Sequence, residues 1–514
     1  MQGANTPVKE DVRMFDDSLY YSPDEAPPAA VAAAPAAMPA SGFNKMFPHL
    51  DPFWKGQVKQ EVLKNLRTLG KKGGLMDAKD PLVTITNPLD ANPELNPDND
   101  NPDMTVGFTF LGQFIDHDIT LDRQPLSDTG PSFPNERTPF FDLDSVYGKG
   151  PQGDPDLYDP AQPEKLRVDF KAPRDLPRVN ELKAIIADGR NDENVIISQM
   201  HLAFIRFHNR IVDHIRESKP PNLFEEARRL VRWHYQFILV NQYLEASLAK
   251  GVYTNVKKNG PTVFKPSPNP QMPREFQVAA FRFGHSQIRP GYKINVGFGA
   301  PIFDAALDTR DPLDQRDMDP NDLRGGRRAP RRFVEWDTFF DFGTLEVAIK
   351  NGKAEVLPKV KKNKRIDPFI SSPLFDLPVG PGLPEPVEDV RTLAARNLER
   401  HLMHDLASGQ AIATELGYTP LKLSQTKELK PLNLHKSSPL WWYILKEAFV
   451  QQDGKRLGQV GSRIIAEVFI GLLLSDSGSY WSTDKNWKPT LPQRDGTVGV
   501  NFTMTDLLSF ARVA

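Results

Sequence analysis

The sequence predicts a mainly α-helical protein with long connecting loops and little β structure. Two long segments, residues 193–218 and 222–250, repeat apolar side chains at the three- and four-residue spacing of one helix face. Regularly spaced short strands, strand–helix–strand alternation and internal repeats are not recognisable in the chain. The 47 prolines among 514 residues indicate many loops between the helices.

The chain divides into a short arm and one large domain. Residues 1–42 are rich in alanine and proline and carry little apolar surface to bury, so we expect a flexible N-terminal arm. Residues 43–514 are expected to form one large helical domain. Residues 79–104, rich in proline, aspartate and asparagine, should form a loop, and the arginine-rich residues 305–335 should form a solvated one.

Several other segments have the apolar spacing of helices. Residues 105–121, TVGFTFLGQFIDHDITL, place Phe110, Phe114 and Ile115 on one helix face. Residues 273–288 begin with Pro273, and proline is favoured in the first turn of a helix. Further helices are expected at residues 386–416, 438–450 and 460–474.

Composition excludes several classes of function. The 64 lysines and arginines nearly balance the 66 aspartates and glutamates, so nothing favours nucleic acid or an anionic membrane as a partner. Cysteine is absent, which excludes disulfides, thiolate catalysis, iron–sulfur clusters and a cysteine-ligated haem. The longest apolar runs, such as residues 468–474, are too short to cross a bilayer, so no transmembrane segment is expected.

The compartment is weakly constrained. The N-terminal residues MQGANTPVKEDVRMF lack the apolar core of a signal peptide. A chain without cysteine fits an extracytoplasmic or oxidant-exposed protein. Secretion is therefore slightly favoured over the cytoplasm, and both remain open.

The segment LGQFIDHDIT (111–120) places a histidine between two aspartates within an otherwise apolar helix. Buried carboxylates are unfavourable unless a partner compensates them. Gln113 and His117 lie four residues apart and face the same way. Asp116 and Asp118 each diverge from the direction of the histidine by about 100°. Side chains that point in three different directions from one helical turn indicate three separate roles. The structural alternative is a hydrogen-bonded core histidine beside two capping aspartates.

A second segment, RTPFFDLDSVYG (137–148), alternates possible oxygen donors. In an extended or looped backbone, alternate residues share one side. Two carboxylates, a hydroxyl and a backbone carbonyl would converge there, and Asp118 is placed to complete the set from the helix. Such hard oxygen ligands suit Ca²⁺. The structural alternative is an ordinary acidic turn. The alternating residues are Thr138, Phe140, Asp142 and Asp144.

A third segment, residues 189–210, opens with GRNDEN ahead of an apolar helix. Arg190 and Glu193 are its candidate functional side chains. The structural alternative is a plain helix start, in which Asn191 or Asp192 is the N-cap and acids occupy the first turn.

Three histidines downstream differ in their surroundings. His201 and His208 lie on the helix after residue 193 and are expected to be packed or hydrogen-bonded side chains rather than metal ligands. His285 directly follows Gly284 in the segment AFRFGHSQI, and a mid-helix glycine costs about 1 kcal/mol against alanine. Either a flat object approaches the backbone at this glycine, or two helices pack closely there.

The segment ARNLERH (395–401) places Asn397 in an amphipathic helix, where its amide would be partly buried. An amide oxygen can accept a hydrogen bond from the spare ring N–H of a metal-ligating histidine. The structural alternative is an asparagine at the edge of the surface.

Taken together, these segments resemble the animal-type haem peroxidases of the peroxidase–cyclooxygenase superfamily. The order along the chain matches: Q-x-x-D-H-D, then T-x-F-x-D-x-[SD]-x-V-Y-G, then R-x-x-E ahead of M-H-x-x-x-x-R-x-H-N-R, then F-R-x-G-H, and last L-x-x-x-N-x-x-R. The resemblance covers about residues 100–475. It implies a large, mainly α haem-peroxidase domain, and the absence of disulfides suits a bacterial branch.

The resemblance implies haem b as cofactor and gives roles to the residues on its distal side. His117 matches the distal histidine, and Arg190 matches the distal catalytic arginine. Gln113 matches the glutamine that bonds distal water and helps to position a halide. Asp116 and Glu193 match the two carboxylates that form ester links to haem.

The proximal side and a Ca²⁺ site follow from the same resemblance. His285 matches the iron ligand, Asn397 its hydrogen-bond partner, and Arg282 the arginine near the haem. Asn194 stands where myeloperoxidase has a methionine that makes a third link, so two ester links at most are expected. The implied Ca²⁺ ligands are Asp118, Thr138, Phe140 through its carbonyl, Asp142 and Asp144.

The implied activity is reduction of hydrogen peroxide, followed by oxidation of bromide, iodide, thiocyanate or phenolic and aromatic donors through a ferryl–porphyrin radical. One alternative is a fatty-acid dioxygenase or cyclooxygenase of the same superfamily. Those enzymes place a radical-carrying tyrosine three residues before the proximal histidine, where this chain has Arg282. Another alternative is a non-catalytic, Ca²⁺-stabilised interaction module, which predicts loss of His117 and Arg190, yet both are present.

Overall fold

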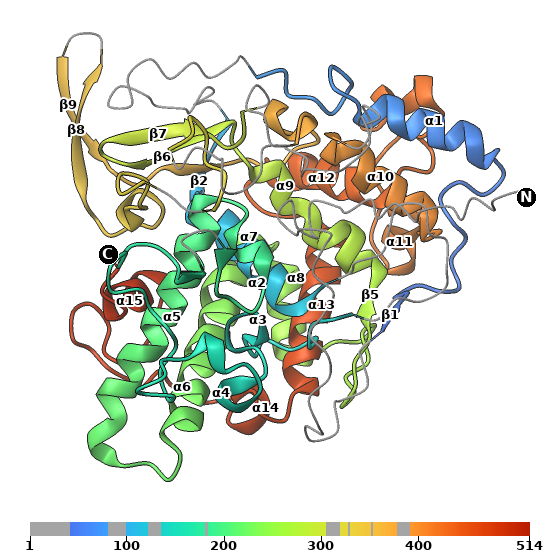
Figure 1. Cartoon of the computed structure of the whole chain (residues 1–514). Coiled ribbons are helices and arrows are strands. Elements are labelled where there is room, and N and C mark those ends of the chain that lie inside the picture. The colour runs from blue at the N-terminus through green and yellow to red at the C-terminus, as the bar shows by residue number, and fades with distance from the viewer. Residues whose placement is uncertain are drawn as a thin grey trace, which may run out of the picture.

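The computed structural model describes residues 42–80, 99–121, 135–179, 183–304, 319–326, 329–350, 353–377 and 391–513. Within these ranges the chain is mainly helical, and its β structure consists of small two-stranded sheets (Figure 1). The predicted fold class is therefore confirmed. The arm predicted for residues 1–42 lies outside the described residues, apart from Gly42.

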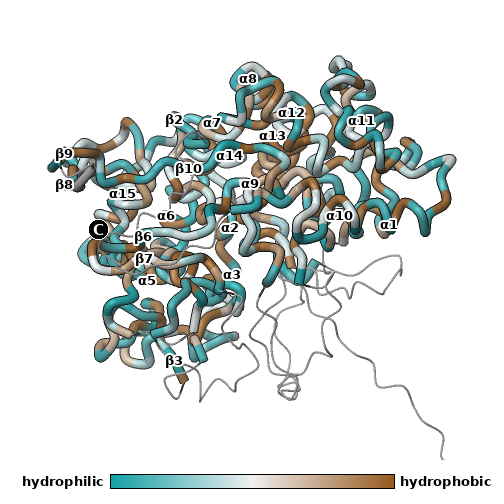
Figure 2. The backbone as a smooth tube through the Cα atoms, turned by 90° about the horizontal axis from the view of Figure 1, so that it is seen from above, coloured by the Kyte–Doolittle hydropathy of each residue, from teal (hydrophilic) through white to brown (hydrophobic). Residues whose placement is uncertain are grey.

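The centre of the molecule is a group of long helices: α2 (Gly107–Ile119), α5 (Val195–Ile215), α6 (Leu223–Ile238), α12 (Leu440–Gln452) and α13 (Gln459–Ser475). α2 packs against α5, α5 packs against α6, and α12 packs against α13. Most residues of α2 and α13 are buried, because both sequences are apolar on more than one face. Figure 2 shows hydrophobic segments recurring along these inner helices.

Outer helices cover this core on several sides. α1 (Lys59–Gly70) packs against α10 (Leu393–Met403), and α8 (Lys250–Asn259) packs against α13. The remaining α-helices are α3 (Asp144–Tyr147), α4 (Gly150–Gly153), α7 (Leu244–Ser247), α9 (Gly284–Gln287), α11 (Gly409–Glu415), α14 (Tyr480–Thr483) and α15 (Met504–Phe510).

The strands pair in twos and form no large sheet among the described residues. β1 (Phe43–Asn44) and β5 (Met272–Pro273) are parallel. The antiparallel pairs are β2 (Asp100–Thr105) with β10 (Lys362–Lys364), β3 (Arg178–Val179) with β4 (Lys183–Ala184), β6 (Gly291–Asn295) with β7 (Phe298–Pro301), and β8 (Leu345–Lys350) with β9 (Lys353–Pro358). The β8–β9 hairpin projects from one end of the molecule (Figure 1).

Two predicted helices are less regular than expected. The predicted helix 222–250 continues from α6 through a π-helical turn at Leu239–Tyr243 into α7. Residues 273–288 do not form one α-helix: a π-helical turn at Glu275–Ala279 and a 3₁₀ turn at Ala280–Phe283 precede the short α9. Gly284 is therefore the first residue of a short helix and not the middle of a long one.

Other segments also differ from expectation. The predicted loop 79–104 contains the start of β2, and the predicted helix 386–416 is two helices, α10 and α11. The arginine-rich segment 305–335 is not simply a solvated loop where it is described, since Asp322 is 0% and Arg332 is 1% exposed. Arg332 donates to backbone carbonyls at Pro320 and Arg324, which compensates its burial.

Among the described residues, no helix has both the length and the apolar character needed to cross a bilayer.

Candidate active site

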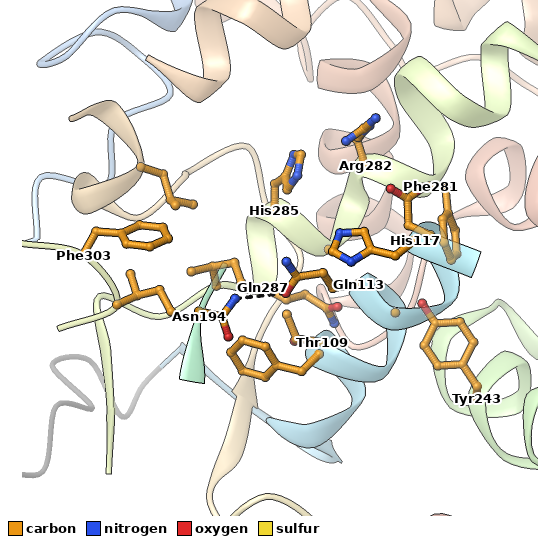
Figure 3. Close-up of a pocket in the computed structure, with 17 residues that line it drawn as sticks. Thr109, Gln113, His117, Asn194, Tyr243, Phe281, Arg282, His285, Gln287 and Phe303 are labelled. Carbon is orange, nitrogen blue, oxygen red and sulfur yellow. Dashed lines mark hydrogen bonds between the residues drawn. The ribbon is translucent and has the colours of Figure 1, made fainter. Parts of the chain in front are cut away.

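A pocket lies between α2 and the short helix α9 (Figure 3). About 760 Å³ of space between atoms lies there, part of it open to solvent. His117 from α2 and His285 from α9 both line it, although 168 positions separate them in the sequence. The other lining residues are Thr109, Phe110, Gly112, Gln113, Asp116, Asn194, Tyr243, Phe281, Arg282, Gly284, Gln287, Ile288, Ile302, Phe303 and Leu374.

Helix α2 points its polar side chains in the separate directions expected from the sequence. Gln113 and His117 face the pocket together. The Gln113 amide donates to the Glu193 carboxylate (3.2 Å) and accepts from the Asn194 amide (3.4 Å; dashed in Figure 3). Gln113 is thus oriented by the turn that precedes α5.

Asp116 lies at the edge of the pocket beside Tyr243. One of its carboxylate oxygens accepts from the Thr120 hydroxyl at 3.1 Å. Tyr243 is buried, and burial followed by the negative charge of Asp116 raises the pKa of its phenol. Gly112 allows the tyrosine to approach, because a Cβ at this position would lie 2.6 Å from its hydroxyl oxygen.

Arg190 and Glu193 are buried close to α2 but do not line the pocket. The Arg190 guanidinium binds Asp188 through Nε (3.0 Å) and Nη2 (2.8 Å). Nη2 also donates to the backbone carbonyls of His117 (3.1 Å) and Thr120 (2.7 Å). The arginine therefore ties the end of α2 to the 3₁₀ turn at Gly189–Asp192.

Asp188 carries the charge that holds this arginine. Burial opposes its ionisation, but the positive charges of Arg190 and Arg137 outweigh burial and lower its pKa. The structural alternative for this segment was wrong in detail. The N-cap of α5 is Asn194, whose side chain accepts from the backbone N–H of Ile196 and Ile197, and not Asn191 or Asp192.

His285 meets Asn397 on the other side of the pocket. Its Nδ1 lies 2.9 Å from the Asn397 side-chain amide, which comes from α10. A half-turn of the amide would exchange its nitrogen and oxygen at this position. The indole of Trp441 approaches His285 edge-on, with ring centroids 6.3 Å apart.

The Asn397 backbone is fixed by a second histidine. His401 donates from Nδ1 to the Asn397 carbonyl (2.7 Å) and accepts from the Trp441 backbone N–H (3.0 Å). Burial lowers the pKa of His401 to about 4, so it is a neutral connector between α10 and α12. Arg282 lines the pocket and donates to the Gln277 carbonyl at 2.9 Å.

Asp118 points away from the pocket toward two further carboxylates, Asp142 and Asp144. One oxygen from each lies within 4.8 Å of the others. Asp118 is 0% exposed, and neither of its oxygens accepts a hydrogen bond of ordinary geometry. Burial, followed by repulsion from its two neighbours, raises the pKa of Asp118 well above its usual value. Burial likewise raises the pKa of Asp144 to about 7.

Thr138 joins this carboxylate cluster. Its hydroxyl donates to Asp142 (2.8 Å) and its backbone N–H donates to Asp144 (3.0 Å). Phe140 lies between them in the same loop. When ionised, these three clustered carboxylates repel one another, and Arg137 at 3.7 Å from Asp144 offsets only part of that repulsion. A divalent cation would compensate the remainder.

Asn191, Asp188, Tyr243 and Asn194 are among the site residues that were not predicted as functional. Asn194 alone had a local signal, because an asparagine directly before an apolar helix is a good N-cap. The contacts of Asn191 with His117, of Tyr243 with Gly112 and of Asp188 with Arg137 join segments that are distant in the sequence, so no motif identifies them.

This chain is similar in sequence to known proteins. Residues 124–298 match the family described as "Animal haem peroxidase". A peroxidase-like protein of Margaritifera margaritifera is 26% identical over 59% of this chain and 44% of its own length. The peroxidasin homologue pxn-2 of Caenorhabditis elegans is 28% identical over 30% of this chain and 13% of its own length.

Peroxidase A of Dictyostelium discoideum is a solved structure similar to this chain. Its TM-score is 0.49 at 17% identity, and the match covers 81% of this chain and 92% of that one. The chain spans less than half the length of the two curated relatives named above. The family match and the peroxidase relatives support the animal haem peroxidase superfamily.

Proposed function

We propose that this protein is a haem peroxidase that reduces hydrogen peroxide and oxidises small anions or aromatic donors. The observation that carries the proposal is the meeting of two remote histidines across one pocket, one of which contacts a buried asparagine amide. A metal-ligating histidine usually bonds a partner through its other ring nitrogen. His285 with Asn397 has this arrangement, and His117 stands opposite.

The residues present fit a haem group. The pocket is lined mainly by apolar and aromatic side chains, as a porphyrin requires. A Cβ at Gly284 would meet no atom within 4 Å, so the glycine leaves open space beside His285. His285 would bind the iron through Nε2, with the Asn397 amide turned so that its oxygen accepts from Nδ1–H. Haem bound in this way would supply the redox centre at which peroxide is reduced.

Two carboxylates are proposed to attach the haem covalently. Asp116 already lines the pocket, so its carboxylate is placed to form one ester. Glu193 is buried one side chain behind, where it accepts from Gln113. A Glu193 ester therefore requires release of that hydrogen bond. Arg282 lines the pocket and would lie against the haem.

His117 is the proposed acid–base group of the reaction. It would accept a proton from hydrogen peroxide at the pocket-facing ring nitrogen and return it to the departing oxygen, which leaves as water. Gln113, one turn earlier on α2, would donate to a distal water or orient a small anion. Both side chains face the pocket from the same helix face.

Arg190 is proposed to stabilise the negative charge that develops as the peroxide bond breaks. In the structure its guanidinium is bound by Asp188 and by two carbonyls of α2, behind the pocket lining. To act on the substrate it must exchange one of these contacts. If Arg190 keeps all of these contacts, it affects the reaction only by holding the backbone of His117 in place.

The carboxylate cluster is proposed to bind Ca²⁺. Asp118, Asp142 and Asp144 would supply three carboxylates. Thr138 and the Phe140 carbonyl would complete the ligand set, as the resemblance implies. Hard oxygen donors and buried negative charge are what this cation requires. Because Asp118 directly follows His117, a bound cation would fix the end of α2 that carries the distal histidine.

The proposed function is tested by loading the purified chain with haemin and measuring peroxide consumption. Wild type should develop a haem absorption band and oxidise bromide, iodide or a phenolic dye only with peroxide. His117→Gln should keep the band and lose about 10²–10⁴-fold in the rate with peroxide. The matched control is His214→Gln, an exposed histidine on α5 away from the pocket, which should behave as wild type.

The outcomes separate the alternatives. A protein that stays colourless after haemin is supplied contradicts haem binding. A haem band without peroxide-dependent oxidation supports a non-catalytic module. Oxygen uptake on linoleate without added peroxide supports a fatty-acid dioxygenase.

A further inference from the structure

A buried amide connects His117 to a second histidine behind the pocket. The Asn191 side-chain oxygen lies 2.9 Å from His117 Nδ1, and its side-chain nitrogen lies 3.0 Å from His201 Nδ1. Asn191 and His201 are 0% exposed and His117 is 2% exposed. The three side chains therefore form a chain of hydrogen bonds that water does not interrupt.

The position of the Asn191 amide is set by the backbone around it. Asn191 lies in the 3₁₀ turn at Gly189–Asp192, and its backbone N–H donates to the Asp188 carbonyl at 3.0 Å. In the same turn Arg190 binds both the Asp188 side chain and the backbone carbonyl of His117. The 3₁₀ turn at Gly189–Asp192 and helix α2 are thus fixed relative to one another by backbone and side-chain contacts.

This arrangement decides which nitrogen of each imidazole carries the proton. An amide oxygen only accepts hydrogen bonds, and an amide NH₂ only donates them. With the Asn191 amide in this orientation, His117 carries its proton on Nδ1 and a lone pair on Nε2. His201 must offer a lone pair at Nδ1. Burial lowers the pKa of His201 to about 4, so this histidine is neutral and able to accept.

We propose that Asn191, anchored by His201, is a positioning residue that holds its amide oxygen toward His117 and so favours the tautomer with Nδ1–H and a lone pair on Nε2. The inference rests on the proposed function, in which Nε2 takes a proton from peroxide. The proton moves from the peroxide oxygen to Nε2 and then to the departing oxygen. The Asn191 oxygen stabilises the positively charged imidazole in between, because it continues to accept from Nδ1–H.

The opposite amide orientation would give a different enzyme. If the Asn191 NH₂ faced His117, Nδ1 would hold the lone pair and Nε2 the proton. His117 would then donate to the pocket and could not take a proton from peroxide. The orientation of the Asn191 amide therefore decides whether His117 can accept a proton from peroxide or can only donate a hydrogen bond to the pocket.

The experiment reads the tautomer of His117 directly by nitrogen NMR. The full chain is labelled with ¹⁵N-histidine and studied before haemin loading and as the diamagnetic iron(II)–carbon monoxide form. His117→Gln identifies the signal. Asn191→Leu removes both amide contacts at similar size, and Asn191→Asp keeps an oxygen facing His117.

The matched control is Tyr147→Phe. The Tyr147 hydroxyl lies 3.0 Å from Nδ1 of His208, another buried histidine of α5, so the variant removes a comparable hydrogen bond away from His117. We expect Nδ1–H at His117 in wild type, Asn191→Asp and Tyr147→Phe. In Asn191→Leu we expect a mixture that includes Nε2–H.

A second readout follows the rate constant for reaction of the haem-loaded chain with peroxide. Loss of an orienting partner typically costs about 10–100-fold, which is the fall expected for Asn191→Leu. Asn191→Asp should recover most of it, and Tyr147→Phe should match wild type. An equal fall in Asn191→Leu and Tyr147→Phe would overturn the inference by showing a general loss of packing.

The wild-type spectrum alone can also overturn the inference, whether or not the variants fold. A wild-type His117 protonated at Nε2 contradicts it, as does an unchanged tautomer in Asn191→Leu. A haem-loaded wild type that does not react with peroxide contradicts the proposed function instead. The NMR result distinguishes these two failures.

Discussion

Glu447 on α12 should make the folded protein less stable as pH rises. Its carboxylate is 0% exposed and caps the start of α13 by accepting from the backbone N–H of Val460 (2.9 Å) and Gly461 (3.4 Å). Burial raises its pKa from 4.5 to about 8. The folded protein therefore keeps a proton on Glu447 at neutral pH, whereas the unfolded chain has lost it.

The sign and size of the effect follow from that difference. A group whose pKa is higher in the folded state favours folding at low pH, and this contribution disappears as pH rises from about 4.5 to about 8. A shift of about 3.5 units at about 1.36 kcal/mol each amounts to about 5 kcal/mol once Glu447 is fully ionised. The wild-type protein should lose most of this amount between pH 5 and pH 9.

The test compares wild type with Glu447→Gln in thermal or urea unfolding across that range. The variant keeps an acceptor for the two backbone N–H groups but places an unpartnered NH₂ in the core, a loss of about 1–3 kcal/mol that does not vary with pH. Wild type should be the more stable protein near pH 5, and the variant should be the more stable one near pH 9.

Glu467 provides the matched control. It is also 0% exposed and accepts from backbone N–H groups at Thr262, Val263 and Phe264, but it pairs with Arg463 at 2.6 Å. Glu467→Gln removes the partner of Arg463 and should lower stability near pH 9, where Glu447→Gln should raise it. Parallel pH curves for wild type and Glu447→Gln would refute the reasoning about burial.

Further predictions concern the candidate site. Asp116→Asn should lose one covalent haem link, detected by mass spectrometry of the intact chain after peroxide treatment, and equal haem retention in acidified solvent would contradict this. A Ca²⁺ chelator should lower the thermal midpoint of wild type, whereas Asp118→Asn should already be less stable and respond less. Gly284→Ala should fold normally, since its Cβ meets no atom within 4 Å, yet bind haemin more weakly because the methyl group enters the pocket. Gly409→Ala should be destabilised by about 1–3 kcal/mol through overpacking, because its Cβ would lie 2.0 Å from the Tyr443 ring.

Local sequence patterns predicted the long helices and the directions of their side chains. The helix expected at residues 105–121 is α2, and its pocket-facing Gln113 and His117 follow from their four-residue spacing. The carboxylates of Asp142 and Asp144 meet Asp118 as the alternation of the loop suggested. These predictions succeeded because each depends on geometry within one element or on one pairing of two elements.

Predictions failed where backbone conformation depends on neighbouring elements. Residues 273–288 have helical apolar spacing, yet they form π and 3₁₀ turns before α9. The distal role that the resemblance gives to Arg190 stays a prediction, and the motif does not show the ion pair with Asp188 that holds the guanidinium behind the pocket lining. Asp188 lies two residues before Arg190, and the sequence does not show which way either side chain turns.

The sequence by itself determined the helical class, the exclusion of cysteine chemistry and the identity of the residues that resemble a haem site. These depend on residue type and on spacing within single segments. Only the tertiary structure decided that His117 and His285 line one pocket, that Asn191 bridges His117 and His201, and that Glu447 is buried with too few donors to ionise easily. The physical reason is that hydrogen-bond partners, burial and pKa values are set by groups brought together from distant segments, and those contacts form only when the chain packs.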